Sequence, residues 1–206
     1  MTNFVSYVTF MKHAKKVAKG KVAKTRPVLS TVYHSDKHVA VTDSHRLYLA
    51  TGLYDGVEKT LDAQTGQEVE HGNYPDVARL IADSDNADYT HDVPVDELYD
   101  ALRAIEIAGK LNKASDLMQI QANVDLIRFK TDGKTDFDVV YSAGNSASKQ
   151  ELYTMTLSIK YLKEAVHVLK DAKVENVSIE YFGAVRPIQL RTDNFTALVL
   201  PVRTKL

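Results

Sequence analysis

The strongest constraint on the fold is a pattern that occurs three times along the chain, an amphipathic helical stretch followed by short strand-like stretches. Apolar residues recur at three- and four-residue spacing, as in a helix with one buried face, over residues 4–19, 94–108 and 158–170. The stretches that follow are rich in β-branched and aromatic residues: 27–33 and 39–49, then 117–121, 126–130 and 136–142, then 177–182, 186–191 and 197–202. This order favours an α+β fold with antiparallel sheets over a doubly wound parallel sheet.

Turn and cap residues separate these stretches. Gly20 is expected to end the first helix, and Ser158 is expected to cap the third. Turn signals occur at residues 35–37 and 64–66. The second of them lies in the polar segment 60–72, which we expect to form a short hairpin or an extended loop.

A chain of 206 residues is long enough for two compact units. The acidic run 83–92 has little hydrophobic content, which is typical of a linker. We therefore place a boundary near residue 90, which divides the chain into residues 1–90 and 91–206.

The composition excludes several kinds of chemistry. The chain has no cysteine, so disulfides, thiolate zinc sites and thiol nucleophiles cannot contribute. Residues 1–6 lack the charged start and long apolar run of a secretion signal, and no stretch approaches the roughly 20 apolar residues of a membrane span. We expect a cytoplasmic protein without a membrane partner.

Charge is distributed unevenly although the formal net charge is only -1. Residues 12–26 hold seven lysines and arginines and no acidic residue, whereas acidic residues dominate residues 55–100. Such a chain can present a basic face to polyanions while an acidic face repels them.

Three separated passages resemble the bacterial DNA polymerase III beta subunit, the sliding clamp, and they follow one another in the order of that family. Residues 25–29 (TRPVL) and 41–47 (VTDSHRL) resemble the first half of the clamp's middle domain. Residues 72–81 (GNYPDVARLI) resemble the stretch between the middle and last domains, and residues 198–203 (LVLPVR) resemble the closing strand.

The resemblance implies an α+β, DNA-clamp-like fold of repeated helix plus antiparallel β-sheet units, amounting to about one and a half clamp domains. Residues 1–90 would be a partial domain, similar to the first half of the middle domain plus a linker, and residues 91–206 a complete last domain. By this resemblance, the polar segment 60–72 would stand in place of the helix-bearing second half of the middle domain.

Clamps of this family enclose duplex DNA with helices whose positive side chains face phosphate without reading sequence. By resemblance the DNA-binding candidates are Lys12, Lys15, Lys16, Lys19, Arg103, Lys110, Lys160, Lys163 and Lys170. The alternative is that these cations only solvate helix faces, above all on the second helix, where acidic residues dilute the positive field: Asp96, Glu97, Asp100 and Glu106.

The family also carries an apolar groove that accepts short peptides of polymerases and other partners. The matching positions are Leu29, Thr42, Ser44, His45, Arg46, Leu47, Leu198, Leu200, Pro201, Val202 and Arg203. The alternative is that these residues are strand core. The chain departs from the family by having Ala82 where proline is usual, and by its ending Thr204-Lys205-Leu206.

Two small clusters invite other interpretations. Asp43-Ser44-His45 contains the residue types of a hydrolase, but neighbours on a strand point to opposite faces and do not converge. His34, Asp36 and His38 are suited to metal binding, yet a surface turn explains them. With no nucleotide-binding glycine loop and no paired catalytic carboxylates, we expect no cofactor, no metal and no enzymatic activity.

The leading hypothesis is a clamp-like accessory of DNA replication, of a type carried by phages or mobile elements. It would bind duplex DNA, clamp-binding peptides of polymerases, or both. Since three clamp-like helices cannot encircle a duplex, we expect a homo-oligomer. The rival hypotheses are a regulatory clamp mimic that competes for clamp partners or the host clamp without binding DNA, and a purely structural interaction module.

Overall fold

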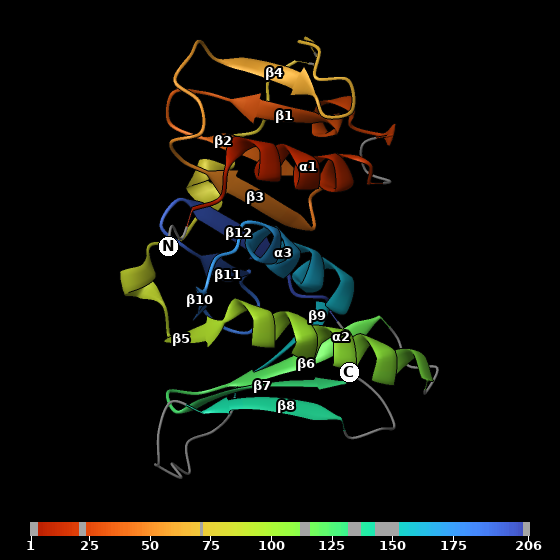
Figure 1. The fold of residues 1–206 in the computed structure, drawn as a ribbon, viewed down its shortest axis with the longest axis vertical. Helices are drawn as coiled ribbons and strands as arrows, with labels where there is room; N and C mark the ends of the chain where they lie inside the picture. Colours follow the sequence, from red (N-terminus) through yellow and green to blue (C-terminus); the bar gives the residue numbers. More distant parts are fainter. Residues whose placement is uncertain are drawn as a thin grey trace.

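Three helices lie side by side across one face of a large sheet (Figure 1). The computed structural model describes residues 4–20, 24–70, 72–111, 116–131, 137–142 and 153–203. The helices are α1 (Tyr7–Ala18), α2 (Val95–Leu111) and α3 (Ile159–Asp171), with α3 in contact with both others. Within the described ranges, no helix is long and apolar enough to cross a membrane.

The large sheet has eight strands in the order β4-β1-β2-β3-β12-β11-β10-β5. Their bounds are β4 Lys59–Asp62, β1 Thr31–His34, β2 Val39–Thr42, β3 Arg46–Ala50, β12 Phe195–Val199, β11 Ile188–Arg191, β10 Asn176–Tyr181 and β5 Tyr89–Pro94. The sheet is continuous because β3 pairs with β12, which places Leu47 opposite Leu198. Strands from the two ends of the chain therefore meet in the middle of the sheet (Figure 1).

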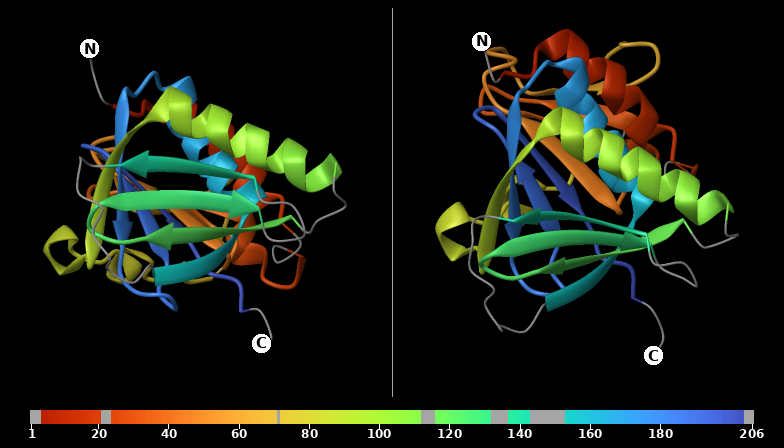
Figure 2. Two further views of the ribbon diagram at one scale, coloured as in Figure 1. Left: turned by 90° about the horizontal axis from the view of Figure 1, so that it is seen from below. Right: turned by 60° about the horizontal axis from the view of Figure 1, so that its bottom comes forward.

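A second sheet has four strands in the order β8-β7-β6-β9. These are β8 (Asp138–Ser142), β7 (Leu126–Thr131), β6 (Leu117–Ala122) and β9 (Tyr153–Ser158). Helix α2 packs on β7, and Figure 2 shows the helix running across this sheet.

The expected α+β architecture is confirmed. Each of the three helices is followed by strands: β1 to β5 after α1, β6 to β9 after α2, and β10 to β12 after α3. Every strand pair among the described residues is antiparallel. The division at residue 90 stays a prediction; the stretches on either side of it share the large sheet and one hydrophobic core.

Helix α1 shows how the sequence forms these elements. The hydroxyl of Ser6 caps the helix by accepting a hydrogen bond from the Thr9 backbone N–H. Phe10, Ala14 and Val17 recur at helical spacing and are fully buried. The ring of Phe10 packs edge-on against Phe195 of β12, 6.4 Å between centroids, which fastens α1 to the centre of the sheet.

The helical predictions are confirmed, but two strand predictions are wrong in detail. The expected strand 27–33 begins instead with a 3-10 turn, η2 (Pro27–Ser30), because proline fixes a helical φ and the Thr31 hydroxyl donates to the Val28 carbonyl. The expected strand 39–49 is a hairpin of β2 and β3, which turns at Ser44 with φ 69°.

The acidic run 83–92 is only partly the expected linker. It contains a 3-10 turn, η4 (Ser84–Asn86), and the first residues of β5. Strand β5 pairs with β10 along its whole length. Strand β9 was not expected at all, although Met155 and Leu157 alternate there with threonines. The segment 60–72 does form a hairpin-like turn, since Gln67 and Glu68 pair back onto β4.

Candidate peptide groove and nucleic-acid interface

A small apolar cluster lies on the face of the large sheet that is turned away from the helices. Leu47 and Leu198 are cross-strand partners at its centre, both buried. Their chain neighbours Tyr48 and Ala197 belong instead to the main core under the helices, as the alternation of side chains along a strand requires. We call this the outer cluster: Ala40, Leu47, Leu49, Val77 and Leu198, with Tyr74, Ala78 and Ile81 packed against it.

Residues 74–82, which we call the strap, cross over the outer cluster and carry a short 3-10 turn, η3 (Ala78–Leu80). The side chain of Leu80 on this turn is 55% exposed. Leu200, the first residue after β12 and two residues beyond Leu198, is 40% exposed. Its backbone N–H donates to the His45 carbonyl at 3.0 Å, which holds the chain in place just past β12. The outer cluster thus has a buried floor and exposed leucines beside it.

A cavity of about 340 Å³ adjoins the outer cluster, with Leu49, Ala78 and Ile81 in its wall. A pocket of this size with a few convergent polar groups is typical of a ligand site. The strap was singled out by its resemblance to clamps, but none of its residues was among the predicted groove positions. The fact that Val77 and Ile81 cover a sheet face could be learned only from the structure.

Some of the remaining groove candidates are buried and others are exposed. Leu29 lies buried in η2 and is not part of the outer cluster. Thr42 and Arg46 are buried, and the Thr42 hydroxyl donates to the Arg46 carbonyl at 2.7 Å. The exposed or partly exposed candidates are Ser44 and His45 in the β2–β3 turn and Pro201, Val202 and Arg203 after β12. Residues 204–206 lie outside the described residues.

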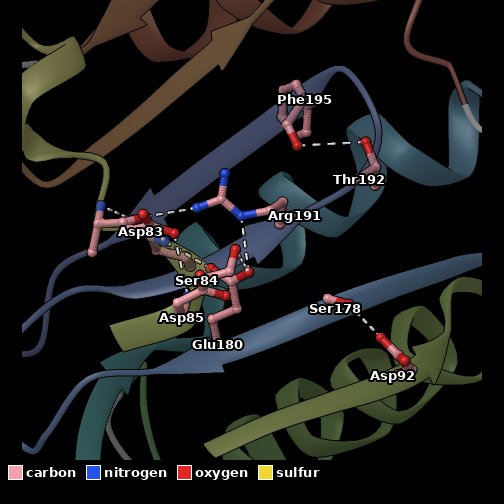
Figure 3. A network of polar contacts seen from close by, with 11 residues as sticks. Asp83, Ser84, Asp85, Asp92, Ser178, Glu180, Arg191, Thr192 and Phe195 are labelled. Atoms are coloured by element: carbon pink, nitrogen blue, oxygen red, sulfur yellow. Dashed lines mark hydrogen bonds and ion pairs between the residues drawn. The ribbon is translucent and has the colours of Figure 1, made fainter. Parts of the chain in front are cut away.

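The strap is anchored by polar contacts to β10 and β11. The Ala82 backbone N–H donates to the Gln189 side chain at 2.7 Å, and the Ala82 carbonyl accepts from Arg191 at 2.8 Å. A proline, usual here in the family, has no N–H and could not make the first bond. Buried Glu180 completes the network by accepting from Ser84, Gln189 and Arg191 (Figure 3).

Five of the nine predicted DNA-binding cations are already in ion pairs. Lys163 and Lys110 both contact Glu106, and Lys170 contacts Asp96 at 2.8 Å. Lys12 contacts Asp171 at 2.6 Å, and Arg103 lies 3.9 Å from Asp100. The acidic residues that dilute the charge of α2 thus neutralise cations of α3 as well, and the positive field of these helices is weaker than their lysine content suggests.

Asp171 joins α3 to α1. It accepts hydrogen bonds from Lys12 and from the buried imidazole of His13, and the His167 ring lies 3.4 Å from its other oxygen. Partial burial raises the pKa of Asp171, but the bonds from Lys12 and His13 outweigh it and hold the value at about 2. Burial lowers the pKa of His13 despite the carboxylate beside it. The ammonium group of Lys12 is therefore paired with Asp171 within the fold.

The four remaining cations, Lys15, Lys16, Lys19 and Lys160, are exposed and form no ion pair with any described residue. Three of them surround one cavity at the ends of α1 and α3. Uncompensated positive charge is therefore concentrated there and is not spread along all three helices.

The Asp43-Ser44-His45 cluster has a structural role. The prediction that these three residues lie on a strand is wrong, since they form the turn between β2 and β3. One Asp43 carboxylate oxygen accepts from the backbone N–H groups of His45 and Arg46, and the other lies 3.2 Å from the Arg46 guanidinium. The carboxylate is thus bound to the turn and does not orient the His45 ring.

The two histidines considered for metal binding are used in packing. The His34 ring is buried, and its Nε2 lies 3.0 Å from the Tyr7 hydroxyl. The His38 ring packs against Tyr33. No group of three potential ligands is close enough to hold a metal ion in the part of the chain that the structure describes.

The architecture is that of a DNA sliding clamp. Solved structures of bacterial DNA polymerase III beta subunits share it: that of Streptococcus pyogenes at a TM-score of 0.71 and 18% identity, covering 96% of this chain and 64% of that one, and that of Streptococcus pneumoniae at 0.72 and 18%, covering 98% and 64%. The Thermotoga maritima subunit superposes at 0.69 with 16% identity, covering 98% and 65%.

These likenesses show the fold, and the chain spans slightly less than two thirds of the clamps it matches. No protein-family model and no curated protein matches the sequence. The structural similarity therefore reaches well beyond the sequence similarity.

Proposed function

We propose that this chain is a clamp-like accessory of DNA replication that binds short linear peptides of polymerases or other partners in the outer cluster. The observation that carries the proposal is the buried apolar floor at the β3–β12 junction with two exposed leucines, Leu80 and Leu200, beside it. An exposed leucine costs free energy in water unless a partner covers it, and apolar side chains of an extended peptide do so.

Leu200→Asp is expected to weaken peptide binding at least tenfold, because a charge replaces an apolar contact that the peptide would bury. The measurement is fluorescence anisotropy with a labelled peptide from the clamp-contacting tail of a bacterial replicative polymerase. Val57→Asp is the matched control, since Val57 is 85% exposed and lies outside the outer cluster. An unchanged affinity in the Leu200 variant, with tight binding by the parent chain, would show that the groove assignment is wrong.

The proposal includes self-association and contact with duplex DNA. Strand β8 is paired on one side only among the described strands, and Val140 on it is 41% exposed. Such an edge favours pairing with another chain. Four unpaired lysines at and near the ends of α1 and α3 supply charge for a sequence-independent phosphate contact.

Light scattering at high protein concentration is expected to give a mass above that of one chain, and a further rise when circular duplex DNA is added at low salt. Reversing the charge of Lys15, Lys16 and Lys19 with glutamate should abolish the second rise and leave the first. A strictly monomeric mass would contradict self-association. If circular duplex DNA left the mass unchanged at low salt, the proposed contact with duplex DNA would be wrong.

The clamp mimic is the second candidate, and the five neutralised cations favour it. A mimic would bind the polymerase peptide with normal affinity while circular DNA has no effect on its mass. The same two measurements therefore separate the candidates.

A further inference from the structure

A cavity of about 440 Å³ opens where α1 ends, α3 begins and the β2–β3 hairpin turns, away from the outer cluster on the opposite face of the sheet. Its principal lining residues are Lys16, Lys19, His45, Arg46, Lys160 and Tyr161. We call it the basic cavity. Gly20, two residues after the end of α1, also lines it. Figure 1 shows α1 and α3 lying next to each other in the helix layer.

The charges of the basic cavity are unbalanced. Asp43 is its acidic lining residue, and both carboxylate oxygens of Asp43 are taken by the turn and by Arg46. Arg46 is itself satisfied by Asp43 and Glu164. The lysines from α1 and α3 have no acidic partner among the described residues, so the cavity has a net positive charge. Three ammonium groups converging on one hollow repel one another unless an anion lies between them.

An aromatic surface forms another wall. The rings of His45 and Tyr161 are stacked, with 5.7 Å between centroids and 15° between planes. The Arg46 guanidinium carbon lies 4.7 Å from the centre of the Tyr161 ring and is held there by its ion pairs with Asp43 and Glu164. His45 is exposed and Tyr161 is partly buried. The ring pair is therefore fixed in orientation but remains accessible at the cavity.

We propose that the basic cavity binds single-stranded DNA, with a phosphodiester between Lys16, Lys19 and Lys160 and a neighbouring base against the His45–Tyr161 stack. Positive side chains next to accessible aromatic rings are the combination with which proteins hold single strands, because every base has a face that can stack. An acidic peptide would satisfy the lysines but leave the stacked rings unused. In a duplex the bases stack on one another and cannot reach the rings.

This inference rests on the proposed function only in taking DNA as the partner, and it adds a second mode of binding. The duplex contact needs positive charge alone, and the peptide groove lies on the other face of the sheet. Because the duplex contact and the basic cavity share Lys16, Lys19 and Lys160, a single strand would take the place of the duplex there while a partner peptide occupies the outer cluster.

The test uses a fluorescein-labelled twelve-residue oligothymidylate in anisotropy titrations with the full chain. Lys16→Glu combined with Lys160→Glu should weaken binding at least tenfold. The matched control is Lys37→Glu combined with Lys173→Glu, which makes the same charge change at exposed lysines that neither line the cavity nor belong to the proposed duplex contact. The control should change affinity less than threefold. Equal losses in the two variants would overturn the proposal, because they would show that only overall charge matters.

Tyr161→Leu tests the stacking wall separately. It should weaken binding of the oligothymidylate at least fivefold, as expected when one stacked base is lost. Binding of an abasic oligonucleotide of the same length should not change. The urea midpoint of each variant is compared with that of the parent chain. Tyr161→Phe keeps the aromatic ring, so this variant should bind the oligothymidylate as the parent chain does. A loss that is equal for abasic and normal strands, or not restored by phenylalanine, would contradict a stacking role.

Two competitors identify the ligand. A duplex of equal length should compete at least tenfold less well than the single strand, and poly-glutamate should not compete at matched charge. Effective competition by poly-glutamate would overturn the assignment to nucleic acid. If the chain binds circular duplex but no oligothymidylate, this inference fails and the proposed function stands. If it binds oligothymidylate but neither duplex nor polymerase peptide, the proposed function fails and this inference stands.

Discussion

Arg46→Ala is expected to lower the free energy of unfolding by about 3 to 5 kcal/mol, the usual result of removing one partner from a buried ion pair. The Arg46 side chain is 3% exposed and is bound to Asp43 and Glu164. Its loss would leave Asp43, which is 6% exposed, and Glu164 without their countercharge. It would also remove the cation from the Tyr161 ring, so binding of single-stranded DNA should fall together with stability.

Urea unfolding at pH 7 measures this change. The control is Arg103→Ala, because the Arg103–Asp100 pair spans 3.9 Å and is more than half exposed on both sides. Such a surface pair contributes about 0 to 1 kcal/mol. If the Arg46 variant lost no more than the Arg103 variant, the guanidinium would not be the centre of a buried network, and the fixed orientation of Tyr161 would lose its physical basis.

Glu180→Ala is expected to cost about 2 to 3 kcal/mol and to release the strap. Glu180 is 2% exposed and accepts bonds from Ser84, Gln189 and Arg191 (Figure 3). Removing it leaves a buried amide and a partly buried guanidinium with fewer partners, which is the costly way to lose hydrogen bonds. Gln189 and Arg191 also hold Ala82, so the covering of the outer cluster should loosen.

Hydrogen exchange followed by mass spectrometry measures the release. Amides of residues 78–86 should exchange at least tenfold faster in the Glu180 variant, and the polymerase peptide should bind less tightly. Asp92→Ala is the control, since Asp92 on neighbouring β5 contacts Ser178 at the exposed surface of the same sheet (Figure 3). Unchanged exchange in the Glu180 variant would mean that the strap is held by Val77 and Ile81 alone.

The helices could be predicted from the sequence because their signals are local. Ser6 and Ser158 cap α1 and α3, and the apolar spacing of Phe10, Ala14 and Val17 is read directly along the chain. The hairpin of β2 and β3 could not be predicted in this way. Its strands are apolar on both faces, because one face packs under the helices and the other under the strap, so residues 39–49 resemble one long strand.

The candidate sites were predictable to a smaller extent. Lys16, Lys19 and Lys160 were named as DNA-facing, but their convergence with Tyr161 depends on how α1 and α3 pack. The neutralisation of Lys12, Lys163 and Lys170 depends on partners 57 to 159 residues away along the chain. Sequence spacing identifies charged helix faces, whereas which charges remain free is decided by tertiary contacts.

The junction of β3 with β12 also determines when the outer cluster can form. Leu198 is synthesised long after Leu47, and the two become neighbours only when both strands are present. Until β12 has been synthesised, the edge of β3 that pairs with it is open, and the outer cluster under the strap lacks Leu198. Under the proposed function, a polypeptide that lacks β12 has no complete surface for a partner peptide.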